Sequence, residues 1–202
     1  VEPTVHVYLP HLVAEEDLQK DALAIRLKKQ HPLYALDVRG LGESLSDDER
    51  SFDHPYGIDY MNNGYGLLLG ESFLGRRVHD VLSTLDLLVH EGARRVHLYG
   101  RGQGSILALF SALLHPKVAT VTLKNAPLSY HSWTQTPLVS WPTANVPRGV
   151  LHVLDLPDCI RALGNKVRLI QPWGPEMKAL TGRPLERALK ETGLSKTLLQ
   201  KT

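Results

Sequence analysis

Three glycines alternate with polar residues in the segment Gly100-Arg101-Gly102-Gln103-Gly104, the part of the sequence most suggestive of chemistry. An apolar run at 96–99 precedes the segment and another apolar stretch at 106–114 follows it, so it is predicted to join a strand to a helix. Backbone amides at the start of a helix bind anions and stabilise negative charge that develops in a reaction. Three interpretations are therefore open: a phosphate-binding loop, a turn that carries a nucleophile, and glycines needed only for packing.

The first interpretation is a Rossmann-like dinucleotide-binding domain with the fingerprint G-x-G-x-x-G. The sixth position of that fingerprint is Ser105 here, where a third glycine is expected. The next predicted strand ends in Lys124-Asn125 and offers no carboxylate for a ribose hydroxyl. The dinucleotide site is accordingly kept as an alternative.

The second interpretation is the G-x-S-x-G turn, or nucleophile elbow, whose glycines allow a strained strand-to-helix connection. Gly100 and Gly104 occupy the two outer positions, and Gly102 stands where the nucleophilic serine belongs. Because glycine has no side chain, the nucleophile position is vacant. In the third interpretation, the glycines only allow the strand and the helix to pack closely.

A second motif favours the elbow. The segment Asp37-Val38-Arg39-Gly40-Leu41-Gly42-Glu43-Ser44 resembles the D-x-R-G-x-G-x-S segment of many α/β hydrolases, and an amphipathic helix and the elbow strand follow in the same order. From about Val5 to Ile170 the chain is most similar to bacterial acetyl xylan esterases and related carbohydrate esterases. The resemblance implies an α/β-hydrolase fold, carboxylic ester hydrolysis, an acetylated polysaccharide or other saccharide as partner, and an extracellular or periplasmic location.

The resemblance also implies where the pocket lies. Residues after the first strand help to form the oxyanion site in this family, which points to His11 and Leu12 together with the amide of Gln103 and its neighbour Arg101. Asp37 and Arg39 are expected to pair with each other and to fix their loop.

The catalytic residues are harder to find. Ser105 is a weak candidate for the nucleophile, because a residue in the first helical turn is more suited to capping or packing. Glu176 is the nearby carboxylate after the late strand, and His131 is the best remaining histidine, since none occurs after His152. We therefore expect a degenerate triad and weak or absent turnover. The alternatives are a non-catalytic saccharide-binding module, for which Trp133, Trp141 and Trp173 could supply aromatic faces, and an interdomain packing module.

Composition excludes several classes of protein. The chain has 202 residues, 43% of them hydrophobic and 22% charged, which is typical of one globular domain. The net charge of +2 comes from scattered residues and predicts no nucleic-acid partner. No apolar run approaches the roughly 18 residues of a membrane span. A single cysteine, Cys159, excludes a disulfide within the chain, and no metal-binding motif occurs, so neither a metal nor a cofactor is expected.

The elements that must position these residues alternate along the chain. Alternating strands and helices predict an α/β protein, a three-layer α/β/α sandwich with a mostly parallel sheet. The chain starts at Val1 without a methionine, so residues 1–202 are interpreted as one domain that lacks terminal strands of the fold and is a piece of a longer chain, whose other domains are candidate partners. Residues 40–75 are predicted to be a long functional loop. The predicted strands are 5–9, 33–38, 96–99, 118–123 and 167–170, and the predicted helices are 15–30, 78–89, 106–114 and 155–163.

Overall fold

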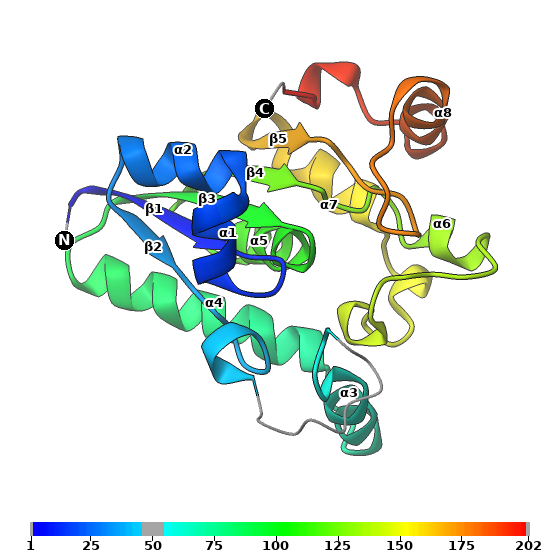
Figure 1. Ribbon diagram of the computed structural model, residues 1–202, viewed down its shortest axis with the longest axis horizontal. Coiled ribbons are helices and arrows are strands. Elements are labelled where there is room, and N and C mark those ends of the chain that lie inside the picture. The colour runs from blue at the N-terminus through cyan, green and yellow to red at the C-terminus, as the bar shows by residue number, and fades with distance from the viewer. Residues whose placement is uncertain (1, 46–54, 201–202) are drawn as a thin grey trace.

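The computed structural model describes residues 2–45 and 55–200 and contains a five-stranded sheet in which every neighbouring pair is parallel (Figure 1). The predicted α/β class is confirmed, and the sheet is parallel throughout its described strands. The strand order is β2-β1-β3-β4-β5. The strands are β1 (Thr4–Leu9), β2 (Leu33–Ala35), β3 (Arg95–Arg101), β4 (Val118–Lys124) and β5 (Val167–Ile170).

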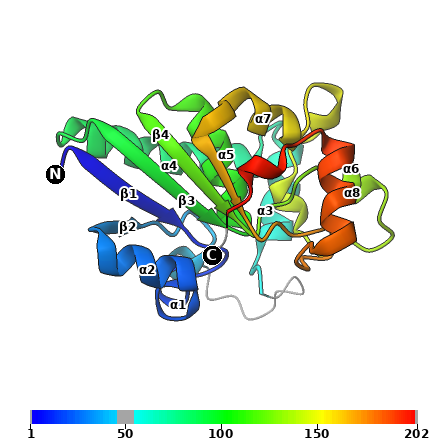
Figure 2. The same cartoon turned by 90° about the horizontal axis from the view of Figure 1, so that it is seen from above.

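Helices cover both faces of the sheet. Figure 2 shows α1 and α2 on one face and α4, α5 and α7 on the other, which confirms the predicted three layers. No helix in the described part of the chain is long and apolar enough to cross a membrane. The helices are α1 (Ala14–Lys20), α2 (Ala22–Gln30), α3 (Asp59–Leu68), α4 (Phe73–His90), α5 (Gln103–Leu114), α6 (His131–Thr134), α7 (Leu156–Leu163) and α8 (Gly182–Thr192).

Two local predictions were wrong. The predicted helix at 15–30 is interrupted at Asp21, whose side chain accepts the amides of Leu23 and Ala24 and so begins a second helix. The predicted loop at 40–75 contains α3, although residues 46–54 of that segment lie outside the described residues. Helix α3 is anchored by a buried ion pair between Asp59 and Arg77 of α4, a contact across 18 positions that local composition does not reveal.

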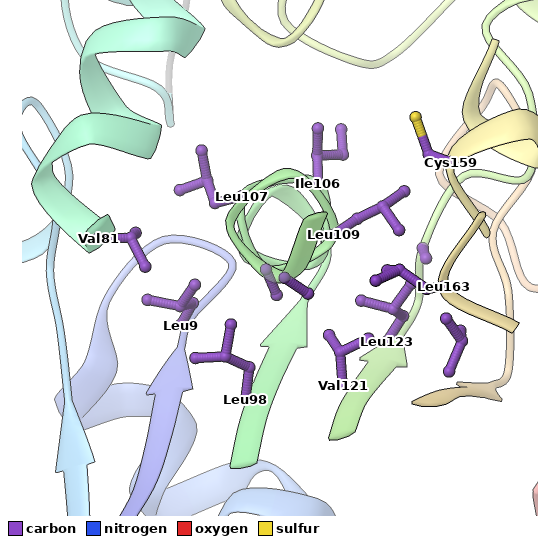
Figure 3. Packing of buried hydrophobic residues seen from close by; sticks show 14 of the residues in the cluster. Leu9, Val81, Leu98, Ile106, Leu107, Leu109, Val121, Leu123, Cys159 and Leu163 are labelled. Carbon is purple, nitrogen blue, oxygen red and sulfur yellow. The ribbon is translucent and has the colours of Figure 1, made fainter. Parts of the chain in front are cut away.

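Helix α5 lies against β1, β3 and β4 at the centre of the core (Figure 3). The backbone segments around the first turn of α5 approach one another so closely that Gly100 and Gly104 have no room for a side chain. A Cβ on Gly104 would lie 2.2 Å from the carbonyl oxygen of Leu9, and a Cβ on Gly100 would lie 2.3 Å from that of Gly104. The two outer glycines of the motif are therefore required for packing, whatever the chemistry of the central position.

Candidate functional site

The carboxyl ends of β1 and β3 form the place where a ligand site is expected in this topology. The chain passes from β1 to β2 on one side and then returns to β3 on the other, so the connections after β1 and β3 diverge. Such a switch point opens a crevice at the carboxyl ends of the strands. His11 follows β1 and Gly102 follows β3, so both lie at this crevice.

Gly102 forms the whole connection between β3 and α5. The strand ends at Arg101 and the helix begins at Gln103, and Gly102 has φ 53° and ψ −119°. This conformation is strained for a residue with a side chain, at a cost of about 1–3 kcal/mol. The backbone thus has the sharp strand-to-helix turn on which the elbow interpretation depends.

The imidazole of His11 fills the space in front of Gly102. A Cβ built on Gly102 would lie 2.1 Å from Nδ1 of His11 and 2.7 Å from its Cγ. The amide of Gln103 donates to the same Nδ1 at 3.2 Å, and the side chain of Gln103 donates from Nε2 to the carbonyl oxygen of His11 at 3.1 Å. The imidazole of His11 therefore fills the place of a nucleophilic side chain. It also accepts the hydrogen bond of the Gln103 amide, which would otherwise be available to an oxyanion.

Aromatic rings hold His11 in this position. Its ring makes edge contacts with Tyr56 and Trp173, with centroid separations of 6.0 and 5.5 Å, and the residue is 9% exposed. Burial lowers the pKa of His11 to about 4, and the charge of Arg101 acts in the same direction. At neutral pH the ring is uncharged, so that Nδ1 has a lone pair for the amide of Gln103.

A buried polar chain extends from His11 into the next layer. Oε1 of Gln103 accepts a hydrogen bond from Nδ2 of Asn145 at 2.9 Å, and the hydroxyl of Tyr130 donates to the carbonyl oxygen of Asn145 at 2.8 Å. Gln103 and Asn145 are each 1% exposed. Fully paired polar networks of this kind fix one arrangement of a core, and this one fixes the side chain next to Gly102.

Four charged side chains form a cluster beside the turn, and of these only Arg101 was expected at the pocket from the sequence. Nη1 of Arg101 donates to Asp17 at 2.6 Å, and Nζ of Lys124 donates to Asp21 at 2.5 Å. The hydroxyl of Tyr8 donates to Asp17 at 3.0 Å. Burial raises the pKa of Asp17, while the neighbouring Arg101 opposes that shift. The available signal was the four-residue spacing of Asp17 and Asp21, which would put both on one face of the predicted helix at 15–30, although Asp21 in fact caps the break between α1 and α2.

A cavity of about 230 Å³ opens beside the charged cluster and His11. It is smaller than the roughly 300–1,000 Å³ of ordinary ligand sites. Three of the four pocket residues implied by the resemblance line it, and the fourth, Gln103, lies behind His11. The lining residues are His11, Leu12, Val13, Glu16, Asp17, Lys20, Asp21 and Arg101.

The remaining catalytic candidates lie apart from this turn or point away from it. Ser105 is 1% exposed and its hydroxyl donates to the carbonyl oxygen of Gly102 at 2.5 Å, so it closes the first turn of α5. His131 is exposed at the start of α6, where its amide donates to Asp155. Glu176 is exposed and pairs with Lys178 at 2.6 Å. None of the described hydrogen bonds or ion pairs brings these three side chains together.

Asp37 and Arg39 fix their loop through other partners, so the expected pair between them is corrected. Asp37 accepts the amides of Ala14 at 2.9 Å and Glu43 at 3.2 Å. The Nε atom of Arg39 donates to Asp80 of α4 at 2.7 Å. The loop is thus joined to α1 and α4.

The three tryptophans pack on one another. The rings of Trp133 and Trp141 stack with centroids 5.4 Å apart, and Trp141 contacts Trp173 at 6.2 Å. Trp133 and Trp141 are 8% and 4% exposed. They form part of the core behind His11, and none of the three lines the cavity.

Comparison with solved structures agrees with this geometry at the level of fold. A Bacteroides fragilis protein provisionally described as an acetyl xylan esterase aligns over 100% of this chain and 59% of its own, with a TM-score of 0.60 and 17% identity. An α/β hydrolase from a Medee basin deep-sea metagenome library and a marine microorganism esterase have TM-scores of 0.37, at 20% and 16% identity, covering 66% and 83% of this chain and 41% and 55% of theirs. No protein-family model and no curated protein sequence matches the chain. The fold is α/β-hydrolase-like, and the chain spans about three fifths of the Bacteroides fragilis protein.

Replacement of Gly102 by serine tests the contact with His11. We expect Gly102→Ser to lower the free energy of unfolding by about 3 kcal/mol, through backbone strain and overlap with the imidazole. In a His11→Ala background the same substitution should cost only the strain, about 1–2 kcal/mol. Urea unfolding of all four proteins measures the coupling. Gly64→Ser is the control, because a Cβ there meets nothing within 4 Å. Equal losses in both backgrounds would remove the clash as the cause.

The neutral state of His11 predicts a pH dependence of stability. Since its folded pKa of about 4 lies below the unfolded value of 6.5, the unfolded chain binds more protons between those values. Stability should fall on acidification from pH 6.5 to 4, with His11 contributing up to about 3 kcal/mol. Unfolding free energies measured over this range should decline less steeply in His11→Asn. Parallel pH profiles for the two proteins would contradict the assignment.

Proposed function

We propose that this protein is a non-hydrolytic module whose elbow keeps the backbone geometry of an α/β hydrolase and has lost its chemistry. The observation that carries the proposal is the 2.1 Å separation between a Cβ built on Gly102 and Nδ1 of His11. No nucleophilic side chain fits there unless His11 moves. The amide of Gln103, which would stabilise an oxyanion, already donates to the same nitrogen.

The rest of the triad supports the same proposal. The expected order is nucleophile, acid and histidine, and residues 153–202, which include β5, supply no histidine. The carboxylate of Glu176 is engaged by Lys178. Removal of essential triad members typically lowers kcat on the order of a million-fold, so ester hydrolysis by this route is not expected.

The dinucleotide alternative meets the same obstacle. A pyrophosphate would need the free amides at the start of α5, and that of Gln103 is paired with His11. Hydrolysis of acetyl xylan, the substrate of the carbohydrate esterases, would need a nucleophile at position 102, where this chain has glycine.

Two roles without turnover remain, and exposed side chains favour one of them. Three apolar side chains lie exposed in the last turn of α3 and just after it: Tyr65 is 56% exposed, Leu68 85% and Leu69 72%. Clustered apolar side chains on a surface mark contacts with other proteins. Saccharide recognition has less support, because Trp133 and Trp141 are buried against each other. We therefore favour packing against another protein domain.

Hydrolysis of p-nitrophenyl acetate tests the loss of chemistry. The protein should give the rate of buffer alone, and so should Gly102→Ser in the His11→Ala background, because the restored hydroxyl still has no histidine base. An active esterase assayed in parallel is the control. Saturable turnover that Ser105→Ala or His131→Ala abolishes would refute the proposal and identify the residue responsible.

Calorimetry with xylose and xylo-oligosaccharides separates the two remaining roles. We expect no saturable heat, since the cavity is small and both of its buried carboxylates are held by Arg101 and Lys124. Glu16→Gln, which changes an exposed lining residue, serves as the matched variant. Saturable heat that this variant reduces would favour saccharide recognition over packing.

A further inference from the structure

Three histidine rings form a stack on the sheet face covered by α2. The ring of His6, from β1, lies 3.9 Å from that of His31, which follows α2, and 5.1 Å from that of His97 of β3. His6 and His97 are direct register partners on adjacent strands. The stack lies about 17 Å from Gly102, because five residues of β3 separate them at roughly 3.3 Å each. It is therefore separate from the site described above.

Two of the rings, those of His6 and His97, are hydrogen-bonded to a hydroxyl group through Nδ1. Nδ1 of His6 is 3.0 Å from the hydroxyl of Tyr99, and Nδ1 of His97 is 2.6 Å from that of Thr120. When the hydroxyl donates to Nδ1, the proton of the neutral ring is on Nε2, and a charged ring also has a proton there. In both states Nε2 is a donor for a further partner.

The charged groups that act on Tyr99 and His97 at the stack include two arginines. Within residues 2–45 and 55–200, no hydrogen bond or ion pair joins a carboxylate to His6, His31 or His97. Arg26 of α2 acts on Tyr99, and Arg95 of β3 acts on His97. Burial followed by His31 and His97 lowers the pKa of His6 to about 4, and burial followed by Arg95 and His31 lowers that of His97. Burial is the largest cause of both shifts, and the neighbouring basic groups add to it.

Accessibility and composition distinguish the stack from an ordinary core. His31 is exposed and His6 and His97 are partly exposed. Both faces of a parallel sheet are normally apolar, whereas His6, His97 and Thr120 share one face here. No group of three ligands able to hold a metal occurs among the described residues.

We propose that the histidine stack is a binding site for an oxyanion, a carboxylate or a phosphate-like group, held by N–H donors of His6, His31 and His97 with Arg26 and Arg95 at its rim. Charge-assisted hydrogen bonds of this kind are the strong ones. A bound anion would also stabilise the protonated form of the rings, so that binding is accompanied by proton uptake. The proposal does not depend on the role assigned to the elbow.

Titration with inorganic sulfate and with acetate at pH 6.0 and 7.5 tests the site, because both are almost entirely in their anionic forms over this range. Ionic strength is held constant with chloride, and NMR of the ring Cε1–H groups reports on each histidine. We expect saturable shifts confined to the three stacked rings, with affinity higher at pH 6.0 by up to about tenfold per pH unit for each proton taken up. Stronger binding of sulfate indicates a phosphate-like ligand, and stronger binding of acetate a carboxylate. Saturation by neither anion overturns the proposal.

Variants keep the test specific. His31→Gln and His97→Gln should weaken binding at least fivefold, and Arg26→Gln, at an exposed position, should weaken it without affecting the fold. His79→Gln on α4 is the matched control, because its ring is exposed on another element and is hydrogen-bonded to Ser83. Urea unfolding checks that each variant is folded. Equal affinity in the Arg26 variant, the control and the unmodified protein would also overturn the proposal.

Discussion

The absence of a side chain at position 102 is the constraint on which the carboxyl edge of the sheet depends. It lets the chain turn from β3 into α5 at one residue and leaves the volume that His11 fills. The imidazole then bonds the amide of Gln103, whose side chain continues to Asn145. The space left at Gly102 thus allows hydrogen bonds that join the loop after β1 to α5 and to the segment after β4. The same vacancy in a hydrolase would be the catalytic centre.

The charged cluster beneath this connection stabilises it at some cost. Asp17, Asp21 and Lys124 have side chains 7% exposed, so their desolvation offsets much of their mutual attraction. Loss of one partner from such a group typically costs about 3–5 kcal/mol, because the remaining charge stays buried. The cluster joins α1 and the start of α2 to the ends of β3 and β4. Its contribution is to fix relative positions, since an apolar cluster would bury the same surface with fewer geometric requirements.

The sequence allowed the sheet, the major helices and the glycine turn to be predicted, because each depends on local periodicity or on glycine at one position. It placed His11 near the pocket through the family resemblance, but it did not reveal that the ring would fill the space at Gly102, a contact across 91 positions. Helix α3 escaped prediction for a similar reason, because its anchor is the ion pair of Asp59 with Arg77. Features set by partners distant in sequence cannot be deduced from spacing alone.

The contact between His11 and Trp173 gives the molecule an internal optical reporter. The two rings meet edge to face at 5.5 Å, and Trp173 adjoins Trp141 and through it Trp133. A protonated imidazole quenches the emission of a neighbouring indole, whereas a neutral one does so weakly. We therefore expect the intrinsic fluorescence of the native protein to respond to the charge of His11 through Trp173, without a label.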